Sequence, residues 1–217
     1  MMSAVHIVPD TVPEQALAAP GVRVALVRLE GRLAAMGLLD RVPGALDEAA
    51  LAWADPAARA AQLLAATRAA GIGGRVTAAL QGSDDPQRWQ AGLAALLALV
   101  EQSPHPSGEW RVLSEVLGAD LLQRLVGVAR SSLARYRSGT RETPAAVAAR
   151  LHHIAMVVAD LEGGYNTYGI RRWFERRRAQ LDGRRPVDLL EGDWDPDDDG
   201  PRRVAELAAA LDASPAT

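Results

Sequence analysis

The sequence contains no cysteine, no lysine and a single phenylalanine among its 217 residues. Without cysteine, disulfides, thiolate zinc sites and cysteine nucleophiles are excluded. Aromatic residues make up 4% of the chain, whereas 42 residues are alanine. Because alanine favours helices, and strands are rich in aromatic and β-branched residues, the composition predicts an all-α protein and argues against a β-sandwich or barrel.

Long hydrophobic runs are also absent. The longest, Ala91–Val100, is interrupted by Gly92 and has half of the ~20 residues that a membrane span requires. Residues 1–10 lack the basic stretch and the apolar core of a secretory signal. Hydrophobic residues nevertheless make up 48% of the chain and charged residues 24%, as in packed globular proteins. We therefore expect a cytoplasmic protein that has no membrane partner.

Opposite charges are separated along the chain, although the net charge is only −3. Residues 124–185 hold 13 arginines and five acidic residues, a net charge of +8. Residues 186–217 hold two arginines and nine acidic residues, a net charge of −7. A basic segment of this kind indicates an anionic partner, and the acidic tail indicates a different role.

Proline and glycine divide the chain into five parts. Residues 1–19 are expected to be a loosely ordered lead-in. A helical domain of unknown role follows over 20–102, where apolar residues recur at helical spacing from Val22 to Met36. The clearest linker is 103–108, Ser-Pro-His-Pro-Ser-Gly. Beyond it, we expect a helix-turn-helix region over 109–161 and a small helical domain with an acidic tail over 162–217.

The second half of the chain is predicted to be a series of helices. They cover residues 110–117, 119–126, 130–137, 143–162, 167–180 and a final stretch from about 201. In the longest of these, Thr143 would cap the first turn with Pro144 at the first helical position, and Gly163 would follow the last turn. Apolar residues from Val147 to Leu161 would line one face of it.

The segment Leu121–Gly139, LLQRLVGVARSSLARYRSG, predicts a helix-turn-helix. Leu125, Val128 and Leu133 would hold its two short helices together, and the second helix would enter the DNA major groove. The candidate base-reading residues are Arg130, Ser131, Ser132 and Arg135, and the candidate phosphate contacts are Arg137 and Arg141. The alternative is a helical hairpin whose arginines are only solvated.

The sequence from Trp110 to Leu211 resembles the Xre/MbcA/ParS antitoxin family. As in that family, the recognition-helix segment VARSSLARYRSG is followed by TPAAVAARL. Trp173 on a helix, then Leu181, then the box Gly183–Leu190 (GRRPVDLL) match the family spacing of a Trp helix, a leucine and a Gly-Arg-x-Pro-x-x-Leu-Leu pattern. The closing helix is similar at Gly200, Val204 and Leu207.

The resemblance implies an antitoxin of a type II toxin–antitoxin system, with an Xre-like helix-turn-helix and a small toxin-binding domain. Such a protein would repress its own operon at an operator DNA and block a cognate toxin by direct contact. Toxins in this family are often of the RES type, which consumes NAD, whereas this chain would need no cofactor and would not be an enzyme. The implied toxin-binding residues are Trp173, Leu181, Arg184, Arg185, Pro186, Leu189 and Leu190.

The chemistry of the box also fits a protein interface. Gly183 can end a helix, and Val187, Leu189 and Leu190 would form an apolar patch beside Arg184 and Arg185. The alternative is that these residues close a small helical core. Because dimers bind palindromic operators, we also expect a homodimer, with the stripes Val22–Met36 and Val147–Leu161 as candidate seams.

Other patterns are weaker. A calcium-loop pattern is matched by Asp195, Asp197, Asp199, Gly200 and Glu206. Arg202 stands at a position that is usually apolar, which favours a solvated acidic turn. His152 and His153 have no acidic residue at ligand spacing, so no metal site is expected. Two functions from other classes stay open: a helix-turn-helix regulator without a toxin, and a helical interaction protein that does not bind DNA.

Overall fold

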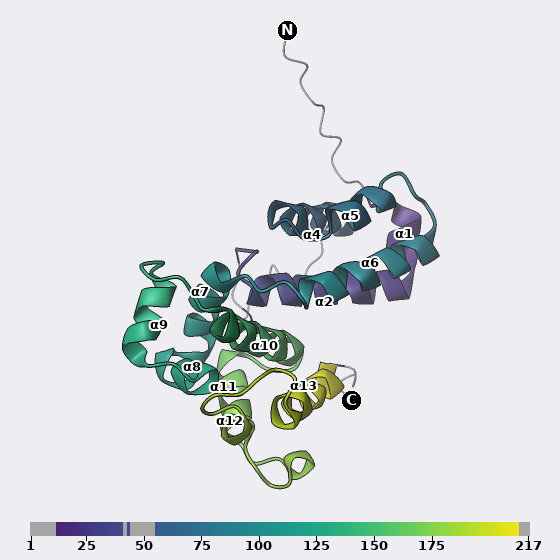
Figure 1. Ribbon diagram of the computed structural model, residues 1–217. Coiled ribbons are helices and arrows are strands. Elements are labelled where there is room, and N and C mark those ends of the chain that lie inside the picture. Colours follow the sequence, from purple (N-terminus) through teal and green to yellow (C-terminus); the bar gives the residue numbers. More distant parts are fainter. Residues whose placement is uncertain (1–11, 41–42, 44–54, 213–217) are drawn as a thin grey trace. The chain divides into compact units, whose positions relative to one another are not determined.

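The computed structural model describes residues 12–40, 43 and 55–212, and every regular element in these ranges is a helix (Figure 1). The expectation of an all-α chain is therefore confirmed. None of the helices described is long and apolar enough to cross a bilayer. The chain forms two compact units, one within residues 1–30 and 47–100 and the other within residues 31–46 and 101–217. Residues 31–46 thus belong to the second unit, although the sequence placed them in the N-terminal domain.

The first unit is helical from Glu14 onward. Asp55 caps a helix as predicted, since its carboxylate accepts a hydrogen bond from the Ala58 amide at 3.0 Å and Pro56 begins the helix. The predicted loose lead-in is wrong at residues 14–18, which are helical, and its first 11 residues lie outside the described ranges. The elements are α1 (Glu14–Ala18), α2 (Pro20–Ala35, up to Glu30 in this unit), α4 (Pro56–Ala69), α5 (Gly74–Leu80) and α6 (Pro86–Val100).

The second unit contains the segments that the sequence associates with function. Its elements are α7 (Pro106–Leu117), α8 (Ala119–Val126), α9 (Arg130–Arg137), α10 (Ala145–Glu162), α11 (Thr167–Glu175), the 3-10 helix η1 (Ala179–Leu181), α12 (Pro186–Leu189) and α13 (Asp199–Asp212). The breaks predicted at Gly118, Gly127 and Gly163 are confirmed. Helix α10 packs against α7, α8, α11 and α13, which makes it the centre of the unit.

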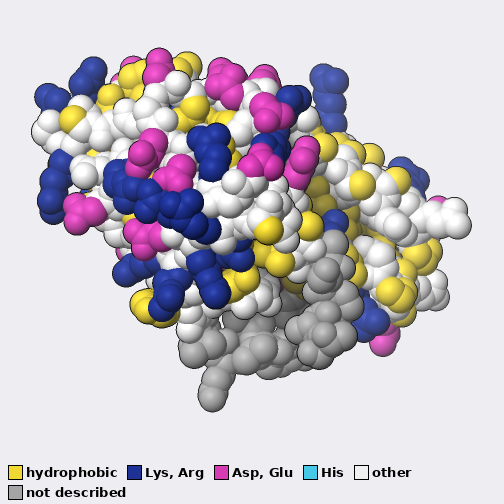
Figure 2. Space-filling model, turned by 90° about the horizontal axis from the view of Figure 1, so that it is seen from below, with side chains coloured by type: hydrophobic (Ala, Val, Ile, Leu, Met, Phe, Trp, Pro, Cys, Tyr) yellow, Lys and Arg dark blue, Asp and Glu magenta, His cyan; other side chains and the backbone are white. Residues whose placement is uncertain are grey.

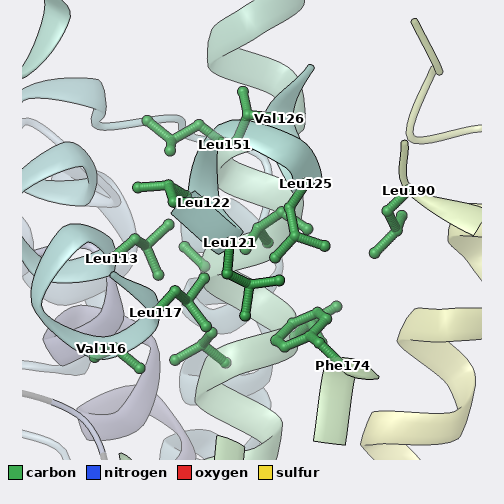
Figure 3. Close-up of a cluster of buried hydrophobic side chains, with 14 of the residues drawn as sticks. Leu113, Val116, Leu117, Leu121, Leu122, Leu125, Val126, Leu151, Phe174 and Leu190 are labelled. Carbon is green, nitrogen blue, oxygen red and sulfur yellow. The ribbon is translucent and has the colours of Figure 1, made fainter. Parts of the chain in front are cut away.

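A single hydrophobic core runs through the whole second unit. Figure 3 shows side chains of α7 and α8 gathered with Leu151 of α10 and Phe174 of α11. The same cluster continues through Leu190 to Val204 of α13. The segments 109–161 and 162–217 therefore share one core.

Both apolar stripes that the sequence offered as dimer seams are buried within the chain. Val22, Leu26, Leu29, Leu33 and Met36 are fully buried, and so are Leu151, Ile154, Val158 and Leu161. These side chains serve as core, so they are not available to a second copy of the chain.

Two details of the predicted helices are wrong for tertiary reasons. Thr143 does not cap α10, which begins at Ala145 after Pro144, because its hydroxyl instead accepts the indole N–H of Trp110 at 3.0 Å. The helix expected over 167–180 ends at Glu175. The chain then turns back so that the Arg178 amide donates to the Arg184 carbonyl at 3.0 Å, and the Arg178 guanidinium lies 5.2 Å from the centre of the Trp173 ring.

Leu151 provides a test of this core. It lies at 0% exposure in the middle of α10, so Leu151→Ala would leave a cavity between α7, α8 and α10. We expect a loss of about 2–5 kcal/mol in the free energy of unfolding. Denaturant unfolding followed by circular dichroism measures it, with Leu211→Ala at an exposed site of α13 as the control, where the change should stay within about 0.5 kcal/mol. Equal effects of the two substitutions would contradict the central role of α10.

Candidate functional site

Helices α8 and α9 are joined by a three-residue turn, Gly127–Ala129. Gly127 has a left-handed backbone (φ 72°) and its amide donates to the carbonyls of Gln123 and Arg124, which ends α8. Leu125 and Leu133 are buried and Val128 is half-buried against the core, as predicted. No side chain caps the N-terminus of α9 at Ala129. The two helices are thus held together by apolar contacts and by the turn.

The inner face of α9 is fixed by an aromatic contact that the sequence pattern does not predict. Tyr136 is buried and its ring stacks on that of Trp110 in α7, with 5.6 Å between the ring centroids. The Trp110 indole in turn donates to Thr143 just before α10. Together with Leu133, this contact fixes which side of α9 faces outward.

The outer face of α9 is basic and open to solvent. Arg130, Ser131, Arg135 and Arg137 are exposed, and Ser132 is half-buried. Arg130 lies 3.4 Å from Asp120, but both side chains are at least 75% exposed, so this pair contributes little to stability. The Arg141 guanidinium lies 5.5 Å from the centre of the Tyr136 ring, beyond the end of α9. All six predicted DNA-binding residues therefore lie on one helix or directly after it.

The box Gly183–Leu190 begins with a tight turn and ends in the core. Pro186 starts α12, and the Asp188 carboxylate accepts both the backbone amide and the guanidinium N–H of Arg185. These hydrogen bonds to Arg185, the side-chain one first, lower the pKa of Asp188 to about 2. Arg184 is exposed and donates to the Asp188 carbonyl at 3.2 Å. Two buried leucines, Leu181 and Leu190, bracket this turn.

The sequence predicts an accessible apolar patch of Val187, Leu189 and Leu190, and this prediction is wrong for Val187 and Leu190. Val187 and Leu190 are 0% exposed and Pro186 is buried, while Trp173 and Leu181 are 1% exposed. They close the core, which was the alternative interpretation. Arg184, Arg185 and the half-buried Leu189 remain accessible. Figure 2 shows arginine side chains gathered on one face of the molecule with acidic side chains among them.

The segment that follows the box contacts the α8–α9 turn. Trp194 is buried and its indole N–H donates to the Leu125 carbonyl of α8 at 2.9 Å. Glu191 pairs with Arg124 of α8 at 2.5 Å. The Trp194 ring also meets the ring of His153 edge to face, at 5.4 Å between centroids. Local sequence patterns do not predict these contacts, because they join residues 41 to 69 positions apart.

A buried polar pair joins α7 to α10. Glu109 is fully buried and accepts a hydrogen bond from the backbone amide of His105. Its carboxylate lies 2.6 Å from Nδ1 of His152, and Nε2 of His152 donates to the Glu101 carbonyl at 3.0 Å. The pair therefore fixes α10 against α7 and explains why His152 is a core residue rather than a metal ligand.

The acidic run 193–199 is an ordered turn. The Asp198 carboxylate accepts the amide of Asp195 at 2.8 Å, and the Asp195 carboxylate accepts the amide of Asp197 at 3.0 Å. Helix α13 already begins at Asp199, so Gly200 and Glu206 are helical and no calcium loop forms. Within the described residues, no three His, Asp or Glu side chains come together as metal ligands.

Comparison of the chain with family models, with curated proteins and with solved structures gave no match.

His153 generates a pH prediction. Burial lowers its pKa below 6.5, against the hydrogen bond to the Pro201 carbonyl, which raises it, and with a smaller lowering by the nearby His152. The unfolded chain then binds a proton more readily than the folded chain, so stability is present above about pH 6.5 and declines as the pH falls below it.

The measurement is denaturant unfolding between pH 8 and pH 5 for the wild type and for His153→Gln, which keeps an N–H donor but does not titrate. We expect the wild type to lose stability more steeply toward pH 5, by at most ~1.4 kcal/mol per pH unit of extra slope. Parallel curves for the two proteins would contradict the assignment.

Proposed function

We propose that this protein is an antitoxin that binds duplex DNA through α9 and a protein toxin through the accessible part of the box Gly183–Leu190. The observation that carries the DNA part is the two-sidedness of α9. Leu133 and Tyr136 face the core, while Arg130, Arg135 and Arg137 face solvent on a short helix that follows a three-residue turn. A helix held by its apolar side against its neighbours, with a basic outer side, suits insertion into a major groove.

The position of each residue along α9 supports a division of labour. Arg130 and Ser131 lie in the first turn, the part of a recognition helix that reaches base edges, and Arg135 lies further along the same exposed side. An arginine can donate two hydrogen bonds to guanine. Arg137 and Arg141 lie at and beyond the C-terminal end, where phosphate contact is the natural role.

The free charge of α9 supports the same proposal. In the described part of the chain, the guanidinium groups of Arg135 and Arg137 make no ion pair, and that of Arg130 has only the exposed Asp120. These side chains can therefore exchange water for phosphate or base contacts without breaking a buried interaction. Their binding would release counterions and fall steeply with salt.

The toxin part of the proposal depends on Arg184 and Leu189. Arg184 is exposed and Leu189 is half-buried at the edge of the core, so part of each side chain is accessible. The exposed Arg177 donates to the Gly183 carbonyl at the start of the box at 3.0 Å. A toxin bound at these residues would be inhibited because the antitoxin covers its active site. The burial of Trp173, Leu181 and Leu190 favours the second candidate, a DNA-binding regulator without a toxin, because folding alone then accounts for most of the box.

We also propose that the protein binds its operator as a homodimer, since palindromic sites take two copies. Neither of the apolar stripes supplies the dimer contact, because both are buried in the core. The contact between copies has to use another surface.

Substitution of α9 tests the DNA part. The double variant Arg130→Ala/Arg135→Ala should bind a duplex from upstream of the protein's own gene more weakly, because each base-reading arginine is worth about 1–3 kcal/mol of discrimination. Helical content should not change, since both side chains are exposed. Fluorescence anisotropy at several salt concentrations measures the affinity.

The matched control is Arg23→Ala/Arg202→Ala, which removes the same charge from exposed sites on α2 and α13. It should leave the affinity nearly unchanged. If both double variants bind the duplex as the wild type does, α9 is not the DNA-reading helix.

A second pair of variants tests the toxin part. Arg184→Ala/Leu189→Asn should reduce co-purification with the product of the adjacent gene, because accessible arginine and leucine side chains at an interface centre contribute about 2 kcal/mol or more when they are hot spots. Arg202→Ala/Leu211→Asn, at exposed positions of α13, is the control and should retain the partner. A folded box variant that retains the partner fully would exclude the box as the interface. If the wild type captures no partner, the regulator without a toxin is favoured.

A further inference from the structure

The residues Glu191–Trp194, called the strap, contact helix α8, the α8–α9 turn and helix α10. The strap follows the box directly and includes the first two residues of the acidic run 193–199. Glu191 pairs with Arg124 of α8 at 2.5 Å, and the Trp194 indole donates to the Leu125 carbonyl at 2.9 Å. On the α10 side, the Arg150 guanidinium pairs with Asp193 and lies 3.5 Å from the Gly192 carbonyl.

Trp194 satisfies a group that α8 cannot satisfy itself. Leu125 is the second-last residue of α8, so its carbonyl is one of the four that have no partner within the helix. The indole N–H supplies that partner in a buried setting, where an unpaired carbonyl would be costly. The indole therefore stabilises the C-terminal end of α8, which Gly127 terminates, directly before the turn to α9.

The turn and the strap also touch through their backbones. A Cβ atom at Gly127 would collide with the Gly192 carbonyl oxygen, so glycine is required there for space as well as for its positive φ. Gly127 is separated from Arg130 by two residues. A displacement of the strap thus acts almost directly on the first residue of α9.

We infer that the strap is a positioning element for α9, and that Trp194 and Glu191 act on DNA recognition through the end of α8 without touching DNA. The inference rests on the proposed DNA-binding function of α9. Hydrogen bonds to base edges require a defined placement of the first turn of the helix, whereas arginine contacts to phosphates tolerate small shifts. Loosening the strap should therefore lower specific binding more than non-specific binding.

The experiment uses the full chain and four variants. Trp194→Phe keeps an aromatic ring but removes the indole donor. Glu191→Arg places two arginines side by side, Arg124→Glu breaks the same pair from the other end, and the double variant Arg124→Glu/Glu191→Arg restores an ion pair with the wild-type net charge. The probes are a duplex from upstream of the protein's own gene and a random duplex of equal length.

We expect the ratio of the two affinities to fall by about tenfold or more in Trp194→Phe and Glu191→Arg, the factor that the loss of one base-reading arginine contact would give. The charge-reversed double variant should recover the wild-type ratio, which a merely destabilised protein would not do. If Trp194→Phe and Glu191→Arg both leave the ratio unchanged, or if the double variant does not recover it, the inference is wrong.

Hydrogen exchange at the turn separates this inference from the proposed function. The amides of Gly127 and Val128 both donate to the Gln123 carbonyl and should exchange faster in Trp194→Phe and Glu191→Arg, while amides in the middle of α10 should not change. A wild type that binds neither duplex refutes the DNA function, and the exchange rates still test the strap. Unchanged exchange at the turn in both variants overturns the inference whatever the DNA result.

Discussion

The burial of helix α10 on nearly every side is the constraint on which the second unit depends. Eleven of its 18 residues are buried, and they include Arg150, His152 and Asp160. A buried polar side chain has to find a partner, and each of these finds one on a different segment. Arg150 meets the strap, His152 meets Glu109 of α7, and Asp160 meets Arg32 at the end of α2 at 2.7 Å. The half-buried His153 adds the Pro201 carbonyl at the start of α13. The apolar face of α10 thus supplies the packing, while its polar side chains specify which segment lies where.

Local signals predicted most of the helices but not the contacts between them. Glycine at helix ends is a local feature, so the bounds of α8 and α9 and the end of α7 could be derived from spacing alone. The start of α7 was predicted wrongly, because the helix begins at Pro106, inside the predicted linker 103–108, and not at Trp110. The end of α11 could not, because Arg176–Arg178 have good helix propensity and only the packing of Arg178 on Trp173 shows why the helix stops. The prediction that Thr143 caps α10 is wrong because its hydroxyl accepts a hydrogen bond from Trp110, which lies 33 residues away in the sequence.

The box shows how a pattern can carry a resemblance and still be explained largely by folding. Gly183 takes a positive φ after Asp182, Pro186 starts α12, and Leu190 enters the core. Arg185 caps the helix through Asp188. A pattern read from sequence alone cannot separate these roles from binding, because both require the same residue types. The structure separates them by exposure: Arg184 is exposed and Leu189 is half-buried at the edge of the core, whereas Pro186, Val187 and Leu190 are buried.

The separation of charge along the sequence has a similar double explanation. Part of the +8 segment is neutralised by acidic residues of the −7 segment, through Arg124 with Glu191, Arg150 with Asp193 and Arg185 with Asp188. In return, Arg203 of the acidic segment pairs with Asp182 at 2.8 Å, which raises the pKa of its guanidinium. The acidic tail therefore has a structural role beside the core.

Because these ion pairs use the arginines nearest the strap and the box, the positive charge left for an anionic partner is concentrated on α9 and on the exposed arginines after α11. A DNA duplex laid along α9 would meet the charge of Arg130, Arg135 and Arg137 without competing with any buried ion pair in the described residues. Under that condition, charge complementarity adds to binding rather than replacing a contact already made.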